Sequence, residues 1–513
     1  MTPSRLCFLV VLGLQPIGLL GACAPTLPTT SPVREARWLA QNWKPGERYW
    51  YHHASEGTST FPIPYAWFMA LEQPEVRLGG EPKLLADESY LKRFGFIPSP
   101  KQLNGGAASE YGYAAEPGSA KADLAAYNQM EEEVNPDGLP VGFARTRGYA
   151  DPVTGKPLPD QVGLTCAACH TGHIEYNGVS LRIDGGSAVT DLDKLTKALG
   201  IALLYTEMLP GRFDRFADRV LGPDRTAEQT AALRGAFGET LKTLKSQGDR
   251  ITSAIKRSGV PTVEEGFNRL DALTRIGNTV FAVDLADGNL DFDPFSNIAA
   301  ITAPVKYPHI WNASWFNWVQ YDASIMQPMV RNAGEAMGVS ARVNLINPDR
   351  KLYASSVPVD NIYKMEQLLA GPNPWSRGPG GMPTGFQGLK APKWPEEVLG
   401  AIDPAKRAHG EALYREICQG CHFPPVSDPA FWDAKFWTKP NNANQSYLIV
   451  EPKNVGTDPA QSDILQYRKV QVPAFLKVDD NGSCDGSSTP PVTQPHFANA
   501  LALLWQFRRD GTR

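Results

Sequence analysis

The sequence lacks the features of membrane-spanning or nucleic-acid-binding proteins. Its 50 basic and 54 acidic residues give a formal net charge of only −4 and form no long runs of one sign. There is therefore no electrostatic basis for nucleic-acid binding or for a polybasic membrane patch. The apolar stretch from Leu6 to Leu20 is too short to span a bilayer as a helix.

Sulfur-containing residues are also scarce, and their positions are informative. The chain has seven cysteines and nine methionines. No methionine follows Met382, whereas four of the cysteines occur in two copies of the pattern Cys-x-x-Cys-His. Shuffling this composition gives on the order of 10⁻³ such motifs, so two copies do not arise by chance.

The spacing within this motif is that of c-type haem attachment. Two cysteines three residues apart lie on one helical turn, so each can form a thioether with a haem vinyl group. The histidine that follows places its imidazole beneath the iron. The sequence therefore predicts two covalently bound haem c groups, held by Cys166, Cys169 and His170 and by Cys418, Cys421 and His422, with the two histidines as iron ligands.

Two alternatives explain the motifs less well. A thioredoxin-like Cys-x-x-Cys requires no histidine directly after it and expects a βαβ context that neither site has. A zinc site needs further ligands at short spacing, and His173 is the one nearby candidate.

The first residues have the pattern of a bacterial lipoprotein signal. Arg5 precedes the apolar stretch, and Leu20-Gly21-Ala22-Cys23 resembles a lipobox, in which the cysteine is lipidated after cleavage. We expect residues 1–22 to be the signal peptide, Cys23 to carry lipid, and the protein to be periplasmic, held to the outer membrane by this anchor alone. An ordinary signal peptide with an incidental cysteine is the alternative. Export agrees with haem attachment, which in bacteria takes place outside the cytoplasm.

Changes in composition and clusters of glycine and proline divide the rest of the chain. Residues 23–60 are predicted to be a tether and an irregular N-terminal extension, 61–385 an N-terminal haem domain with insertions, and 386–513 a C-terminal cytochrome c domain. The boundary follows from the glycines and prolines between residues 371 and 395. The predicted fold class is mostly α: two cytochrome c-type haem domains with a large helical insertion and a small β-ribbon.

Local patterns place several elements. Asn177-Gly178 between apolar residues predicts a hairpin just after the first motif. Asp191 is the predicted cap of a helix that runs to about Met208, and capping boxes at Thr226 and Thr262 predict two more helix starts. The histidines at positions 52 and 53 are expected in a solvent-facing loop, with a role as iron ligands as the alternative.

The second iron lacks a methionine candidate for its sixth ligand. His496 is the single histidine downstream of His422. The sequence therefore predicts a second haem iron held between His422 and His496, with a surface histidine as the alternative.

Longer stretches resemble bacterial dihaem cytochrome c peroxidases, including their rubber-oxygenase-like branch. The resemblance covers roughly residues 60 to 470, and Gly410 to Tyr414 resembles the first helix of small cytochrome c domains. The segments that carry it are 135–143, 182–186, 307–312, 320–322 and 327–335.

The resemblance implies a reactive N-terminal haem that receives electrons from the C-terminal haem. Hydrogen peroxide or dioxygen would be the substrate, a small redox protein the electron donor, and calcium a further cofactor, for which no acidic cluster identifies a site. Glu335 is the candidate for moving the peroxide proton, because a positioned carboxylate can take and return it. Gln320 is the polar alternative, and a solvated Glu335 or one paired with Arg331 is the structural alternative.

Three further groups of residues bear on the chemistry. Phe292, Phe295 or Phe316 would instead form an apolar pocket that favours dioxygen. Trp311, Trp315 and Trp318 are candidates for electron passage between the haems, and His309 for a reversible ligand. The competing functions are an electron carrier with two inert haems and a rubber-oxygenase-like dioxygenase, since fold alone does not determine function.

Overall fold

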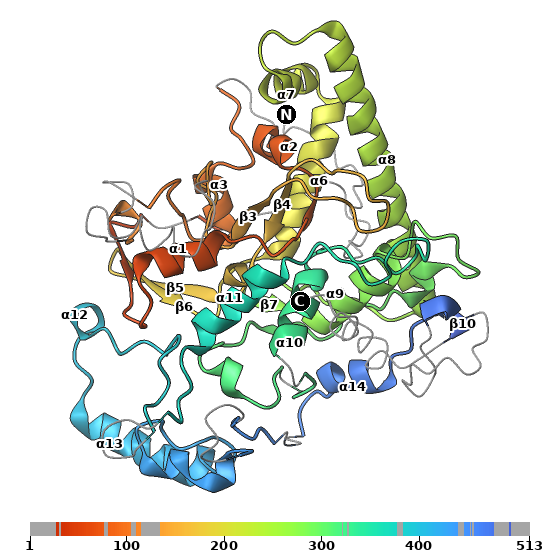
Figure 1. Ribbon diagram of the computed structural model, residues 1–513. Coiled ribbons are helices and arrows are strands. Elements are labelled where there is room, and N and C mark those ends of the chain that lie inside the picture. The colour runs from red at the N-terminus through yellow and green to blue at the C-terminus, as the bar shows by residue number, and fades with distance from the viewer. Residues whose placement is uncertain are drawn as a thin grey trace.

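The computed structural model describes residues 27–29, 32–75, 81–103, 109–113, 134–320, 322–325, 328–376, 383–439, 446–451, 453, 456–476 and 492–493. Over these residues the chain is rich in helices and carries small sheets, as Figure 1 shows. The helices are α1 Pro45–His53, α2 Tyr65–Ala70, α3 Glu88–Leu91, α6 Leu192–Met208, α7 Arg212–Leu221, α8 Ala227–Ser258, α9 Ala272–Asn278, α10 Pro328–Gly338, α11 Val359–Ala370, α12 Glu396–Leu399, α13 Pro404–Leu413 and α14 Ala460–Tyr467.

The strands pair into sheets of two or three. The strands are β1 Glu35–Trp38, β2 Phe61–Pro64, β3 Phe143–Thr146, β4 Gln161–Leu164, β5 Thr171–Tyr176, β6 Val179–Asp184, β7 Arg269–Leu270, β8 Val305–Lys306, β9 Val472–Pro473 and β10 Val492–Thr493. The larger sheets have the orders β1-β6-β5 and β2-β4-β3. The expectation of a mostly helical protein therefore holds in part, because the strands are more numerous than the single ribbon predicted.

The predicted hairpin after the first motif is confirmed. Strands β5 and β6 pair antiparallel, with Tyr176 opposite Val179. Asn177 and Gly178 both have positive φ, 48° and 76°, as a two-residue turn between twisted strands requires. Strand β1 adds to the other edge of β6 in parallel.

The helical insertion follows this hairpin. Asp191 caps α6, and Thr226 forms the capping box of the long helix α8, as predicted. The capping box predicted at Thr262 is wrong. The Glu265 carboxylate instead accepts from Arg275 Nε at 3.0 Å and from the Asp271 N–H at 2.7 Å, and Asp271 caps the later helix α9.

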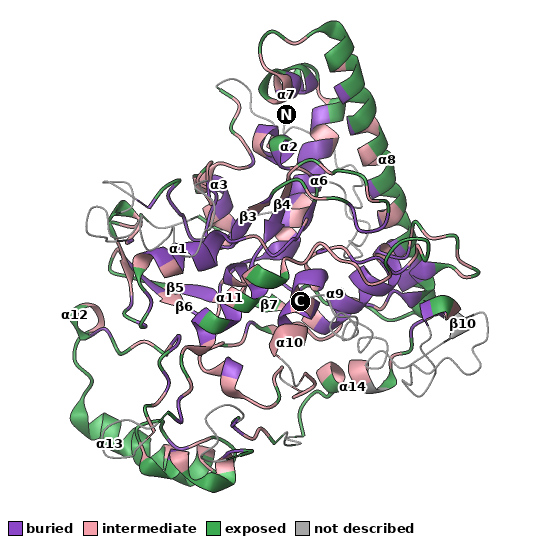
Figure 2. Cartoon of the chain, in the orientation of Figure 1, coloured by how far each residue is buried: buried purple, intermediate pink, exposed green. Residues whose placement is uncertain are grey.

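The C-terminal part has a distinct exposure pattern. Figure 2 shows α13 almost wholly exposed, whereas α1 and α9 are largely buried. Val470, Val472 and Leu476 pack into one cluster with residues of α9 and α10. The predicted boundary between residues 385 and 386 stays a prediction.

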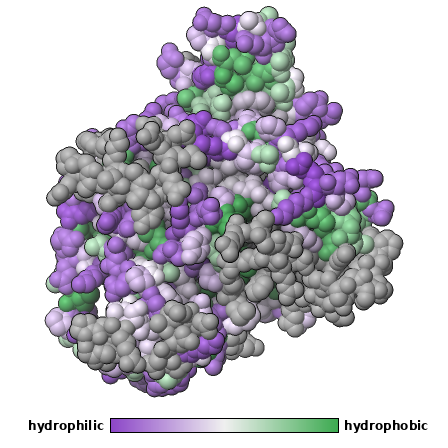
Figure 3. Space-filling model, viewed as in Figure 1, coloured by the Kyte–Doolittle hydropathy of each residue, from purple (hydrophilic) through white to green (hydrophobic). Residues whose placement is uncertain are grey.

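The surface is mixed. In Figure 3 apolar residues gather in separate patches, one of them near α7 at the top of the view, and much of the coloured face is hydrophilic. Among the described residues, no helix combines the length and the apolar character needed to cross a bilayer.

A buried carboxyl group beside β-bridge residue Val343 leads to a testable pH dependence. Asp284 is only 8% exposed and its Oδ2 has no hydrogen-bond partner. Burial raises the pKa of Asp284 to about 7, because the opposing effect of Arg342, itself paired with Asp151 and Asp287, is smaller.

Because the folded-state pKa lies above the unfolded value, the stability that depends on Asp284 is present below pH 4 and lost as the pH rises through 7. We expect Asp284→Asn to leave the free energy of unfolding unchanged near pH 4 and to raise it by up to about 4 kcal/mol at pH 8. Urea titrations across this range measure the difference, with the exposed Asp349→Asn as control. A difference that does not vary with pH would contradict this account.

Candidate functional site

The two Cys-x-x-Cys-His motifs adopt the same tight turn. In the first, the Cys169 and His170 N–H groups donate to the Cys166 carbonyl at 3.2 and 2.9 Å. In the second, Cys421 and His422 donate to the Cys418 carbonyl at 3.0 and 2.9 Å. Each turn therefore gathers its two thiols and its imidazole within one turn of backbone, and all four cysteines are free thiols.

The first motif is locked in place by its neighbours in the fold. Strand β4 leads into it, and the Thr165 hydroxyl caps the turn by accepting from the Ala167 N–H at 3.3 Å. The Glu56 carboxylate accepts from the Cys166 N–H at 2.6 Å. Gly142, with φ of 91°, lies so close that a Cβ there would be 2.3 Å from Ala168 Cα, so only glycine fits.

His170 has the arrangement of a metal-ligating histidine. Its Nδ1 donates to the Pro308 carbonyl at 2.9 Å, which leaves the Nε2 lone pair available. Burial lowers the pKa of His170, so the ring is neutral near pH 7. A neutral imidazole oriented through its other nitrogen is how proteins present histidine to a metal.

The predicted catalytic residues Glu335 and Gln320 meet beside this motif. Gln320 Nε2 donates to Glu335 Oε1 at 3.0 Å, although 15 residues separate them in the chain. Glu335, on α10, acts electrostatically on both thiols and on His170: it raises the pKa of each, while burial is the largest effect on all three. The carboxylate and its amide partner thus lie within electrostatic range of the first motif.

The alternative partner of Glu335 is occupied elsewhere. Arg331 forms a 2.8 Å ion pair with Glu366, and both side chains are largely buried. Glu335 is half-buried and is thus not a solvated helix-face carboxylate.

Two residues of this site had no signal in the sequence. Glu56 is 1% exposed, and burial raises its pKa to about 7, so it is partly protonated at neutral pH. The Tyr51 hydroxyl, on a fully buried side chain, has no hydrogen-bond partner among the described residues. Both precede the motif by more than 100 residues, and no local pattern marks them.

The adjacent histidines at positions 52 and 53 are not in a solvent-facing loop, so that prediction is wrong. Both lie in α1 and are at most 1% exposed. His52 Nε2 donates to Asp184 Oδ1 at 2.8 Å and its Nδ1 accepts from the Tyr113 hydroxyl.

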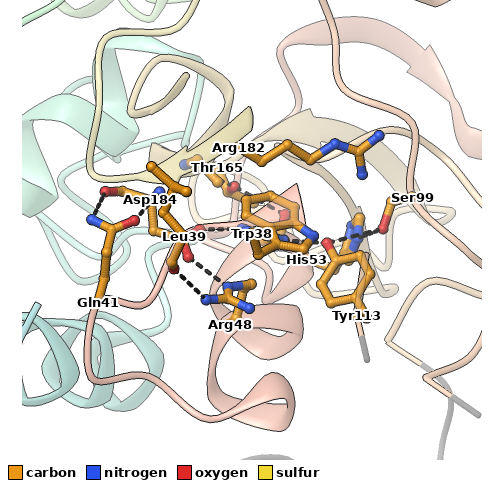
Figure 4. A network of polar contacts seen from close by, with 12 residues as sticks. Trp38, Leu39, Gln41, Arg48, His53, Ser99, Tyr113, Thr165, Arg182 and Asp184 are labelled. Carbon is orange, nitrogen blue, oxygen red and sulfur yellow. Dashed lines mark hydrogen bonds and ion pairs between the residues drawn. The ribbon is translucent and has the colours of Figure 1, made fainter. Parts of the chain in front are cut away.

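His53 bonds the Phe143 carbonyl and the Ser99 hydroxyl at 3.0 and 2.8 Å. Because both nitrogens of each ring are used in this network, drawn in part in Figure 4, neither histidine is free to bind iron in this arrangement.

Asp184 is the centre of that network. It is fully buried; although burial alone would raise its pKa, Arg48 at 2.6 Å and His52 lower it. Its carbonyl also accepts from Gln41 and from the Trp311 indole, at 2.8 and 2.7 Å. The network therefore connects α1 and β6 to the segment that supports His170.

The second motif is far more exposed. Its first cysteine is the last residue of the helical turn η7, Tyr414–Cys418, which continues α13. Ile417 is 69% exposed and Leu413 40% exposed.

Residues 308–316 connect the surroundings of the two motifs. Trp311 packs against the cluster that contacts Cys166, and Trp315 packs against the aromatic cluster that contacts Phe423, the residue after His422. His309 stacks on Trp311 with ring centroids 4.4 Å apart. It follows Pro308, whose carbonyl accepts from His170 Nδ1, and its role as a reversible ligand stays a prediction.

Other predicted residues are not brought together. Phe292, Phe295 and Phe316 pack into three different clusters, none of which contains Cys166. Trp318 is 36% exposed. Cys23 and His496 lie outside the described residues, and within the described ranges no cluster of three His, Cys, Asp or Glu side chains is arranged for a metal ion.

Comparison with known proteins identifies a relative. No protein-family model matches the chain, and no solved structure matches it. The uncharacterized protein y4iJ of Sinorhizobium fredii (strain NBRC 101917 / NGR234) is 43% identical over 493 residues, which cover 91% of this chain and 74% of that protein. Identity at this level over this length means that the chain belongs to the same family as y4iJ.

Proposed function

We propose that this protein is an exported dihaem c-type cytochrome oxidoreductase that reduces hydrogen peroxide at its N-terminal haem with electrons relayed by its C-terminal haem. The observation that carries the proposal is the contact of Gln320 and Glu335 beside a haem-attachment motif. The second motif, in the same backbone turn, provides the second redox centre. Export, lipidation at Cys23 and a small redox protein as donor belong to the same proposal.

The residues of the first motif fit a covalently bound haem. Cys166 and Cys169 supply thiols for the thioethers, and His170 Nε2 supplies a neutral nitrogen ligand. The unpartnered Tyr51 hydroxyl is a buried donor that a porphyrin carboxylate would satisfy. At the second site, Cys418, Cys421 and His422 supply the same donors and exposed apolar residues supply a surface for the ring.

Proton transfer is the part of the reaction that this chain's own residues carry out. Reduction of one hydrogen peroxide to two waters consumes two electrons and two protons, and the haem when bound supplies the site of electron transfer. Glu335 takes the proton of the proximal peroxide oxygen and returns it to the leaving oxygen. Gln320 holds the carboxylate in position through its 3.0 Å hydrogen bond.

Electron delivery uses the segment between the motifs. Trp311 and Trp315 pack toward the first and the second motif respectively, within a stretch of five residues. The indole N–H of Trp315 is fixed by the Ala370 carbonyl at 3.0 Å, as that of Trp311 is by Asp184. Two aromatic rings held this way offer a short route between the redox centres.

The experiment is spectroscopic. Protein matured with the haem-attachment machinery should show, by EPR of the half-reduced form, one high-spin haem that turns over hydrogen peroxide with a small cytochrome as donor. Two low-spin haems without peroxide turnover would establish the electron carrier instead. Cleavage of an alkene polymer that depends on dioxygen, without an electron donor, would establish the dioxygenase.

A further inference from the structure

A cavity of about 330 Å³ lies on one face of the β1-β6-β5 sheet. Paired residues of the sheet form the floor of the cavity: His173 is directly opposite Arg182, and Ala36 is beside Ser180. Residues paired in this way point to the same face. The volume is in the range of small-molecule sites.

A buried cation, Arg182, lines this cavity. It is 4% exposed, and its Nε has no hydrogen-bond partner among the residues that the structure describes. Its Nη1 donates to the carbonyls of Tyr111 and Pro98, and its guanidinium lies 5.6 Å from the centre of the Trp38 ring. Among the described residues, no carboxylate lies within 4 Å of it. Arginine buried without a carboxylate is rare, because desolvation of the charge goes uncompensated.

Two further features define the ligand. The Nδ1 of His173, which also lines the cavity, is buried and has no partner. Phe96, Ile97 and Pro98 form a buried apolar wall. The cavity therefore offers partners both for a charged acceptor group at one end of a ligand and for an apolar body. A purely inorganic anion has no apolar body and is disfavoured.

Four acidic residues line the cavity; three of them have partners of their own, and the fourth, Glu110, is exposed. Glu88 accepts from the Tyr111 hydroxyl, and Glu175 forms a 3.4 Å ion pair with Lys92. Glu35, at the exposed rim, pairs with Arg37. Glu88 and Glu175 favour the charged form of Arg182 electrostatically, but neither forms an ion pair with it.

We propose that this cavity binds a small organic carboxylate, with the carboxylate accepting from Arg182 Nε and His173 Nδ1 and the apolar body against Phe96 and Ile97. Such a ligand supplies the missing counter-ion and satisfies both orphaned nitrogens. The proposal is independent of haem binding, since none of these residues belongs to either Cys-x-x-Cys-His motif.

Calorimetric titration of the full-length protein with benzoate tests the proposal. We expect saturable binding of one benzoate per chain, with benzamide and sulfate at least about tenfold weaker, because benzamide lacks the charge that pairs with Arg182 and sulfate lacks the apolar body. Arg182→Gln should weaken benzoate binding by about tenfold or more, while Arg407→Gln, at an exposed arginine of α13, should not.

A second variant keeps the test decisive if Arg182→Gln fails to fold. Ala36→Leu fills the cavity from β1 without touching Arg182 and is expected to abolish benzoate binding while leaving the circular dichroism spectrum unchanged. Equal binding of benzamide or of sulfate would overturn the assignment to organic carboxylates. Absence of benzoate binding at millimolar concentration, or full binding by Ala36→Leu, would overturn the site itself.

Discussion

Replacing Cys166 and Cys169 together by serine is expected to remove one of two covalently bound haems and to abolish peroxide turnover. Serine cannot form the thioether that holds the porphyrin, while the turn itself, capped by Thr165 and bonded to Glu56, remains. The intact mass of the mature protein should fall by one haem. The pyridine haemochrome absorbance per chain should fall by about half.

The second motif provides the matched comparison. Replacing Cys418 and Cys421 by serine should remove the other haem and leave the first, with turnover lost because the electron supply is cut. Cys484→Ser, outside both motifs, should keep the wild-type mass of bound haem. If the Cys166 and Cys169 variant retained two covalent haems, or if the wild type carried none, the proposed function would be untenable.

Glu335→Gln is expected to lower kcat for hydrogen peroxide by about 10²–10⁴-fold, because the amide cannot move the peroxide proton. Both haems should remain bound, since Glu335 contacts Gln320 and not the thioether-forming atoms. Steady-state oxidation of a reduced cytochrome donor measures the rate. The haem content measured on the same samples excludes a defect in maturation.

Two further variants are compared with Glu335→Gln. Asp360→Asn, at an exposed carboxylate in the first turn of α11, should leave kcat unchanged. Gln320→Leu removes the hydrogen bond that positions Glu335 and keeps the carboxylate, so a smaller decrease is expected than for Glu335→Gln. Wild-type turnover by Glu335→Gln would assign proton transfer to another group, with the buried Glu56 as the nearest alternative carboxyl.

Local signals in the sequence were sufficient to predict several structural elements. The Asn177-Gly178 turn, the Asp191 cap and the Thr226 capping box each depend on residues within four positions of one another, and the structure contains all three. The same holds for the two Cys-x-x-Cys-His turns, whose hydrogen bonds span three and four residues. The Thr262 box failed because Glu265 has a stronger partner, the buried Arg275, ten residues away.

Contacts between distant segments were decided only by the tertiary structure. Glu56 reaches Cys166 across 110 residues and His52 reaches Asp184 across 132, and no periodicity or spacing encodes such pairs. Burial then determines the protonation of these groups: it lowers the pKa of His170, which keeps the imidazole neutral, and raises the pKa of Glu56 to about 7.

The sequence by itself determined the prediction of haem attachment, because that chemistry requires fixed residue types at fixed spacing. Which side chains contact the motifs, which of them are charged and where cavities lie depended on packing, because desolvation and long-range hydrogen bonds exist only once the chain has folded.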